Sequence, residues 1–445
     1  MKIRLSDSFS YGRLIRFTLP SIAMMIFTSI YSVVDGFFVS NFAGKTPFAA
    51  VNLIMPVLQI LGTVGFMFGT GGTALISNTF GAGDKERANR YFSLIVYVAF
   101  GLGLVLAILG FVFIRPIAAL FGAEGELLDN CVLYARIIIC ALPFYVLQMM
   151  FQSFSVAAEK PQLGLLVTVS AGLTNIILDA VLVVLLSGEY KLAGAAIATA
   201  LAQMVGGIIP LFYFFRENNS ILRLGKTRFE SKPIYKACTN GSSEFMSNVS
   251  MNLVGILDNL QLMKYAGEDG VAAYGVMMYV SMIFSAAFLG YTIGVAPVIG
   301  FHYGAQNYVE LKGLLRKSLV MISVFGVAMV GTAELLAAPI SKAFVGYDVG
   351  LLKLTISGFR IFALCFAFLG FGIFVSGFFT ALNDGLISAI IAFLRTLVFQ
   401  SAAILILPMI WGFNGVWVSV VVAEFMSLVL GSVFLLLKKN KYRYW

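Results

Sequence analysis

The chain has 445 residues, of which 60% are hydrophobic and only 11% are charged, and it carries a net charge of +9. Its mean hydropathy of +0.94 excludes a water-soluble domain with a solvated surface and predicts an integral membrane protein. The basic residues lie in loops between apolar segments, so the positive charge indicates membrane topology and not nucleic-acid binding. The lipid bilayer is therefore an expected partner, and nucleic acid is not.

Twelve apolar runs follow one another along the chain, each long enough to cross a bilayer as a helix. The basic opening stretch, residues 1–13, precedes an apolar run that is too long for a signal peptide and has no small-residue cleavage site, so we interpret that run as an uncleaved first span. The expected fold is all-α, and the predicted spans cover residues 14–40, 48–77, 91–114, 131–155, 163–187, 192–215, 236–263, 271–299, 318–340, 356–381, 386–409 and 413–437.

The loops on the side of the N-terminus hold most of the Lys and Arg residues. Because cytoplasmic loops are enriched in these residues, both termini are expected in the cytoplasm. The missing signal peptide, the short loops and the basic tail are compatible with the cell (inner) membrane, where we expect the protein. The four cysteines are scattered without paired spacing, so the sequence predicts neither a disulfide framework nor a metal cluster.

The second half of the chain repeats the first at a constant offset of 223 residues. This offset aligns Asp35 with Asp258, Gly44 with Gly267, Gly71 with Gly294, Gly81 with Gly304 and Pro116 with Pro339. It predicts two pseudo-symmetric six-helix bundles: an N-terminal lobe (1–215), a cytoplasmic linker (216–235) and a C-terminal lobe (236–445). Two lobes of the same orientation leave a cleft around which they can rock, which favours a transporter over a channel or a membrane enzyme.

Four polar residues of the first lobe form a candidate ion site. Asn175 and Asp179 share one helix face, and Asp35 and Thr199 lie at a similar depth in their own spans. Charged groups inside a bilayer are costly and are usually functional. Two carboxylates, an amide and a hydroxyl are suited to Na+ or to a shared proton, so we predict the coupling site here and no other cofactor. For Asp35, the alternative is a helix-end aspartate bonded to neighbouring amides.

Pro20 lies fifteen residues before Asp35 in the first predicted span. Proline removes a backbone hydrogen bond and favours a bend, which we expect to be coupled to the charge of Asp35; a static kink is the alternative.

Four further residues are candidates for substrate contacts or gates: Glu244, Asp258, Tyr31 and Met277. For Glu244, capping of the start of its span is the simpler interpretation. Asp258 is fourteen residues, or about 21 Å, from Glu244 along one helix, so the two cannot share a site there. Tyr31 and Met277 represent the aromatic and methionine side chains that suit amphiphilic organic cations of varied shape.

The chain resembles the multidrug and toxic compound extrusion (MATE) family over nearly its whole length. The resemblance rests on the repeat and on residues 31–35 (Tyr-Ser-Val-Val-Asp), 78–82, 175–179, 194–199 and 303–307 in this order. It implies a V-shaped pair of lobes that export organic cations in exchange for Na+ or H+, with the ion at Asp35, Asn175, Asp179 and Thr199 and with Pro20 at the bend of the first span. The start of span seven, residues 241–244, is similar to the bacterial MepA-like branch. Span ten has no acid, which favours an ion site in the first lobe.

The sequence leaves two alternative functions open. A lipid-linked oligosaccharide flippase of the same superfamily would need a more basic cleft, whereas this sequence places acids there. A membrane sensor or enzyme would need a metal cluster, a nucleophile–base pair or a soluble domain. The sequence does not choose between Na+ and H+ and does not name the substrate, and the chain is expected to act as a monomer.

Overall fold

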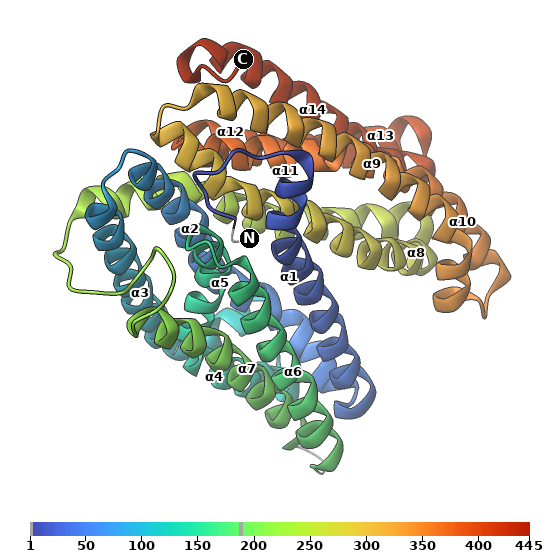
Figure 1. The fold of residues 1–445 in the computed structure, drawn as a ribbon. Coiled ribbons are helices and arrows are strands. Elements are labelled where there is room, and N and C mark those ends of the chain that lie inside the picture. The colour runs from blue at the N-terminus through green and yellow to red at the C-terminus, as the bar shows by residue number, and fades with distance from the viewer. Residues whose placement is uncertain (1–2, 187–189) are drawn as a thin grey trace.

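The computed structural model describes residues 3–186 and 190–445, and this part of the chain is helical with no strand. The helices form two arms that diverge from the side on which both chain ends lie (Figure 1). We call this side the termini side. The helices are α1 (Tyr11–Phe38), α2 (Lys45–Gly81), α3 (Lys85–Leu120), α4 (Gly125–Cys140), α5 (Leu142–Ala157), α6 (Pro161–Leu185), α7 (Tyr190–Phe215), α8 (Ser231–Gly304), α9 (Tyr308–Val345), α10 (Val349–Ala363), α11 (Phe366–Ala381), α12 (Gly385–Phe393), α13 (Gln400–Trp411) and α14 (Phe413–Tyr442), with π-helical segments at Val39–Ala43 and Leu394–Phe399.

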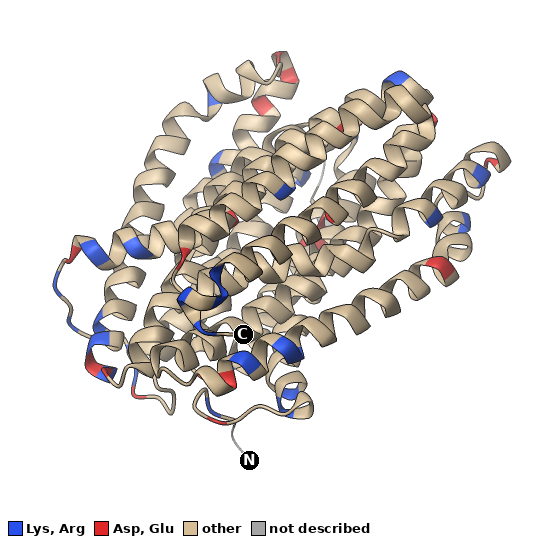
Figure 2. Cartoon of the chain, turned by 90° about the horizontal axis from the view of Figure 1, so that it is seen from above, with Lys and Arg blue, Asp and Glu red and all other residues tan. Residues whose placement is uncertain are grey.

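Each predicted span is helical over nearly all of its described residues, and residue 187, the end of the fifth predicted span, lies outside the described residues. Among the described residues, nine helices are long and apolar enough to cross a membrane, and two bent pairs pass the same test together. The remaining predicted span, 236–263, is the part of α8 before Gly267, where a φ of 62° interrupts the helix. This part is less apolar because it carries side chains such as Asn240, Glu244 and Asn248. Charged residues gather near helix ends and loops, with long uncharged stretches between them (Figure 2).

The fourth and tenth predicted spans are each broken in two. The α4–α5 pair bends by 60° and the α10–α11 pair by 45°. Pro143 lies in the first turn of α5 and accounts for part of the first bend. The second break, at Leu364 and Cys365, has no proline but lies 223 residues after Ala141 and Leu142. The bend therefore belongs to the repeated unit and does not depend on proline alone.

The repeat extends to the caps of the helices. Asp84 caps α3 and Asn307 caps α9, each accepting a hydrogen bond from the backbone N–H three residues later. The residue before each cap is left-handed: Gly83 has a φ of 90° and Gln306 a φ of 55°. Both pairs are separated by 223 residues, so the offset seen in the sequence describes the structure.

The two lobes meet on the termini side where α2 crosses α8. A Cβ added to Gly81 would lie 2.0 Å from the carbonyl oxygen of Phe301, and one added to Gly304 would lie 2.0 Å from that of Asn78. These two contacts are repeats of each other, as in a two-fold interface. Gly241 of α8 approaches the α2 backbone in the same way. The lobes thus touch backbone to backbone, and only glycine fits at these positions. We call this contact the glycine seam.

The first residues of the chain tie the lobes together on the same side. The backbone N–H of Leu5 donates to Glu159 Oε1 at 2.9 Å, at the end of α5. The N–H of Phe9 donates to Glu310 Oε1 at 2.8 Å, in the first turn of α9. Both apolar side chains are buried. Residues 3–10 therefore form a strap between the lobes, which we call the N-terminal strap.

The C-terminal segment is anchored outside the spans at Asp384, the N-cap of α12. Lys441 Nζ lies 3.2 Å from Asp384 Oδ2, and the Tyr442 hydroxyl donates to the same oxygen. Burial alone raises the pKa of Asp384, but the hydrogen bonds from Tyr442 and Lys441 outweigh it and hold the pKa below its usual value.

Candidate functional site

The four residues predicted for the ion site come together in the N-terminal lobe. Thr199 Oγ1 donates to Asp35 Oδ1 at 3.4 Å, and Asn175 Nδ2 donates to Thr199 Oγ1 at 3.4 Å. The carboxyl groups of Asp35 and Asp179 face each other closely enough to share a proton. The site thus joins three helices, α1, α6 and α7, over a sequence separation of 164 residues.

The site is buried and has too few hydrogen-bond donors for its acceptor oxygens. Asp35 is 6% exposed, Asn175 2% and Asp179 0%. Within the described residues, no N–H or O–H group reaches either oxygen of Asp179 or the Asn175 Oδ1 atom. Two buried carboxylates in contact repel each other unless a cation or a proton lies between them. Three acceptor oxygens without donors are ligands of the kind that hard cations prefer, so the residues present fit Na+ as well as H+.

Asp35 lies near the end of α1, which is unusually rich in hydroxyl side chains. Thr28, Ser29 and Ser32 each donate to a carbonyl one turn earlier in the same helix. Such bonds, together with the missing N–H of Pro20, favour bending. α1 nevertheless remains one helix from end to end here. The coupling of a bend at Pro20 to the charge of Asp35 therefore stays a prediction.

Tyr134 of α4 belongs to the same site, although the sequence did not indicate it. Its side chain is fully buried next to Thr199, and the carboxyl groups of Asp35 and Asp179 lie within electrostatic range of its hydroxyl. Its hydroxyl oxygen is buried without a clear partner among the described residues. A tyrosine near the start of a predicted span resembles the many interfacial tyrosines of membrane proteins, so no pattern could separate it from them.

The other candidate residues are divided between the lobes. Tyr31 lies one turn before Asp35 on α1 and packs against Phe27. Asp258 is buried in the C-terminal lobe, where its Oδ2 atom accepts a hydrogen bond from the Tyr274 hydroxyl at 2.8 Å. Met277 is also fully buried in that lobe. Only Tyr31 of these candidates adjoins the ion site.

Glu244 lies between the lobes. It lines a small cavity of about 20 Å3, enough for one water molecule, with residues of both lobes: Thr70, Thr73 and Ser153 from the first, and Leu289, Thr292 and Thr380 from the second. The interpretation of Glu244 as a helix cap is wrong, because α8 begins at Ser231, well before it. For the same reason, the segment between α7 and α8 is residues 216–230, shorter than the predicted linker.

Arg395, a charged residue inside the eleventh predicted span, has an acidic partner on another helix. Its guanidinium forms two hydrogen bonds of 3.0 Å with the carboxylate of Glu424 on α14, and both side chains are nearly buried. Arg395 lies in the π-helical segment Leu394–Phe399, within electrostatic range of Glu244. The second lobe thus has a buried ion pair where the first has an unpaired set of acids.

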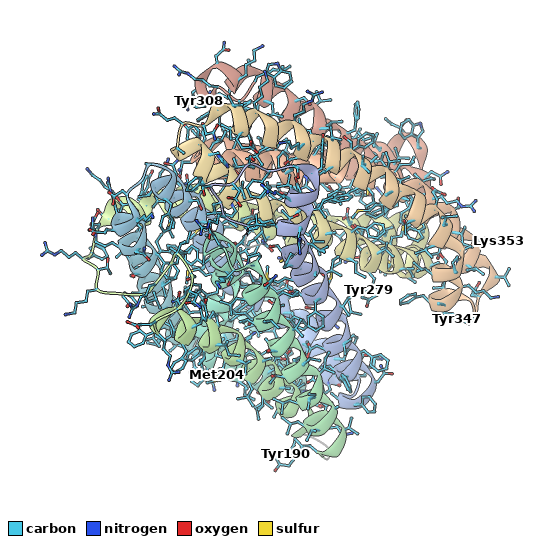
Figure 3. The ribbon with its side chains drawn as sticks, in the orientation of Figure 1. Tyr190, Met204, Tyr279, Tyr308, Tyr347 and Lys353 are labelled. Carbon is cyan, nitrogen blue, oxygen red and sulfur yellow. The ribbon has the colours of Figure 1, made fainter. Side chains whose placement is uncertain are left out.

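The open side of the molecule carries exposed aromatic and methionine side chains. Tyr190 lies at the tip of the N-terminal arm, and Tyr347 and Lys353 at the tip of the C-terminal arm (Figure 3). Tyr279 lies on the face of the C-terminal arm that is turned toward α1 (Figure 3). It is 46% exposed, and its neighbour Met278 is 40% exposed. Of these side chains, Tyr279 faces the other arm (Figure 3).

The two-arm helical fold with buried acids in its apolar helices is typical of a multi-pass membrane transporter. A model of the MatE family matches residues 20–181 and again residues 245–405. The chain belongs to the MatE family, which confirms the predicted family. Members of this family are transporters, so the chain is a multi-pass protein of the cell membrane and not an enzyme.

Curated relatives match nearly the whole length of the chain. The multidrug export protein MepA of Staphylococcus haemolyticus is 26% identical over 440 residues, which cover 98% of this chain and 95% of the relative. MepA of Staphylococcus aureus is 24% identical over 441 residues, covering 97% and 94%.

Solved structures share the fold. An outward-facing multidrug resistance MATE transporter matches with a TM-score of 0.92 and 22% identity over 99% of this chain and 98% of that one. A MOP superfamily transporter from Pyrococcus furiosus matches with a TM-score of 0.90 and 22% identity over the same shares. These matches confirm the predicted all-α fold of twelve transmembrane helices in two pseudo-symmetric six-helix bundles.

Proposed function

We propose that this protein exports amphiphilic organic cations in exchange for Na+ or H+ by alternating access of its two lobes. The observation that carries this proposal is the pair of buried, facing carboxylates, Asp35 and Asp179, without enough donors around them. The multidrug export function of the MepA relatives supports the substrate class. In this proposal residues 1–215 and 236–445 are the moving lobes, and both termini lie in the cytoplasm.

Coupling follows from the position of α1. A cation or proton between Asp35 and Asp179 removes their repulsion, and its departure restores it. The other end of α1 contacts the second lobe, where Gly294 of α8 fits against Thr18. Pro20 lies between the two contacts. A change of charge at Asp35 can thus alter the shape of α1 and shift the equilibrium between the two openings of the transporter.

The organic cation is proposed to bind between the lobes. Glu244 supplies a negative charge there, and Tyr31 supplies an aromatic face next to the ion site. Asp258 and Met277, which are buried in this state, are proposed as gate residues that become accessible when the second lobe moves. The residues that line the cavity at Glu244 include no Lys or Arg, which disfavours a flippase for an anionic lipid. The chain is proposed to act as a monomer.

Efflux of ethidium from proteoliposomes that contain the purified protein tests this proposal. We expect efflux that requires an inward Na+ or H+ gradient and that is lost in Asp179→Asn. Asp129→Asn, which changes an exposed ion pair with Arg115 on the protein surface, is the matched control and should leave efflux unchanged. Efflux that is independent of both gradients, or that persists in Asp179→Asn, would overturn the proposal.

A further inference from the structure

A basic cavity lies on the termini side, away from the ion site. It has a volume of about 370 Å3, and one wall is the first turns of α3 while the other is the segment that joins α7 to α8. Its charged and amide lining residues are Lys85, Glu86, Asn89, Arg90, Arg223 and Lys226. Four cations therefore share this cavity with a single acid.

The walls of the cavity are fixed by hydrogen bonds. The backbone N–H of Arg223 donates to Asn89 Oδ1 at 2.8 Å, and the N–H of Gly225 donates to Ser93 Oγ at 3.0 Å. The side chain of Leu224, between them, is buried. Residues 216–230, which we call the interlobe segment, are thus fixed in position along α3. Arg223 and Lys226 of this segment are therefore held beside Lys85 and Arg90 of the helix.

The cations are mostly free to bind an anion. In the described part of the chain, only Arg223 of the four has an acidic partner within ion-pair distance, Glu217 at 3.5 Å, and both of these side chains are more than half exposed. Arg and Lys groups that converge on one cavity are suited to phosphate oxygens. With both termini in the cytoplasm, the cavity opens where the apolar stretch of α3 begins, at the level of lipid headgroups.

We propose that this cavity binds the phosphate of an anionic phospholipid from the cytoplasmic leaflet. The lipid holds the interlobe segment against α3 and so links the composition of the membrane to the only covalent connection between the lobes. Free inorganic phosphate shares the charge but lacks the acyl chains, so it binds much more weakly. This site is separate from the proposed transport function, and the test below does not depend on transport.

The test measures the affinity of the purified full chain for phosphatidylglycerol in detergent micelles, with phosphatidylcholine as the neutral lipid. The double variant Arg90→Gln, Arg223→Gln should bind phosphatidylglycerol about thirtyfold more weakly, since each cation near the membrane surface contributes roughly fivefold. The matched control Arg228→Gln, Lys232→Gln removes the same charge outside the cavity and should change the affinity by less than about threefold. The double variant Arg90→Lys, Arg223→Lys, which keeps both charges, should retain binding.

Three results would overturn the proposal. The first is an equal loss in the control variant, which would show that overall charge is responsible. The second is no preference for phosphatidylglycerol over phosphatidylcholine. The third is full competition by millimolar inorganic phosphate, which would identify the ligand as a soluble anion.

Discussion

Replacing Gly241 with alanine perturbs the glycine seam by a single methyl group. The added Cβ would lie 1.9 Å from the carbonyl oxygen of Met67 and 2.9 Å from its Cα. A carbon–oxygen contact needs about 3.3 Å, so α2 and α8 must separate by about 1.4 Å. Overpacking of this kind costs about 1–3 kcal/mol. Gly241→Ala raises the free energy only of the state in which the seam is closed. The equilibrium constant for opening on the termini side should therefore rise about 5- to 150-fold.

The native thiol of Cys238 reports this change. It lies in α8 of the second lobe, is partly buried and packs against the core of the first lobe. In a Cys140→Ser background the other two cysteines, Cys131 and Cys365, are buried. A membrane-impermeant maleimide applied to the termini side should therefore modify Cys238 selectively. We expect Gly241→Ala to increase the rate of modification at least about fivefold.

Gly255→Ala is the matched control for this experiment. Gly255 is also an interior residue of α8, but among the described residues nothing beyond the backbone of its own helix turn lies within 4 Å of the position that its Cβ would take. The gain in helix propensity is therefore the same and the overlap is absent. If Gly241→Ala is modified at the wild-type rate, or if Gly255→Ala is accelerated equally, the seam does not close the termini side.

Three further predictions concern other contacts. Glu424→Gln leaves Arg395 buried without its counter-charge and should destabilise the protein by about 3–5 kcal/mol, seen as a lower unfolding temperature in detergent; an unchanged temperature would mean that water replaces the pair. Glu310→Ala removes the acceptor of the Phe9 N–H and should accelerate hydrogen exchange at that amide at least tenfold, since a bond to a charged group contributes about 1.5–3 kcal/mol; unchanged exchange would contradict a strap held by this bond. The lowered pKa of Asp384 means that its carboxylate stabilises the fold above its unfolded pKa and that this contribution is lost as the pH falls. Asp384→Asn should therefore lower the unfolding temperature at pH 7, and the difference should shrink below about pH 4; a difference that is constant with pH would refute this assignment.

Those parts of the structure that repeat along the chain could be predicted from the sequence. The apolar runs predicted the helices, and one offset predicted equivalent caps at Asp84 and Asn307. Asn175 and Asp179 share a face by helix geometry alone. A similar depth in the bilayer was enough to predict that Asp35 and Thr199 lie near Asn175 and Asp179. Residues at the same depth in neighbouring spans lie in one plane parallel to the membrane.

Contacts that depend on the rotation of one helix against another were not predictable. Arg395 and Glu424 lie on different spans, and nothing in either span tells which faces turn inward. Tyr134 has the same difficulty, with the added problem that tyrosines are common near membrane interfaces. Glu244 was misjudged for a different reason. The polar residues before it resemble the end of a loop, yet they lie inside a helix whose polar side chains are covered by the facing lobe.

In the proposed mechanism the organic cation and the coupling ion bind in exchange, with the ion at Asp35 and Asp179. The most direct test of this exchange adds ethidium to the purified wild-type protein in weak buffer and follows free Na+ with an ion-selective electrode and free H+ with a pH electrode. We expect the release of close to one equivalent of one of these ions, and no release from Asp179→Asn. Ethidium binding to the wild-type protein without release of either ion would contradict it.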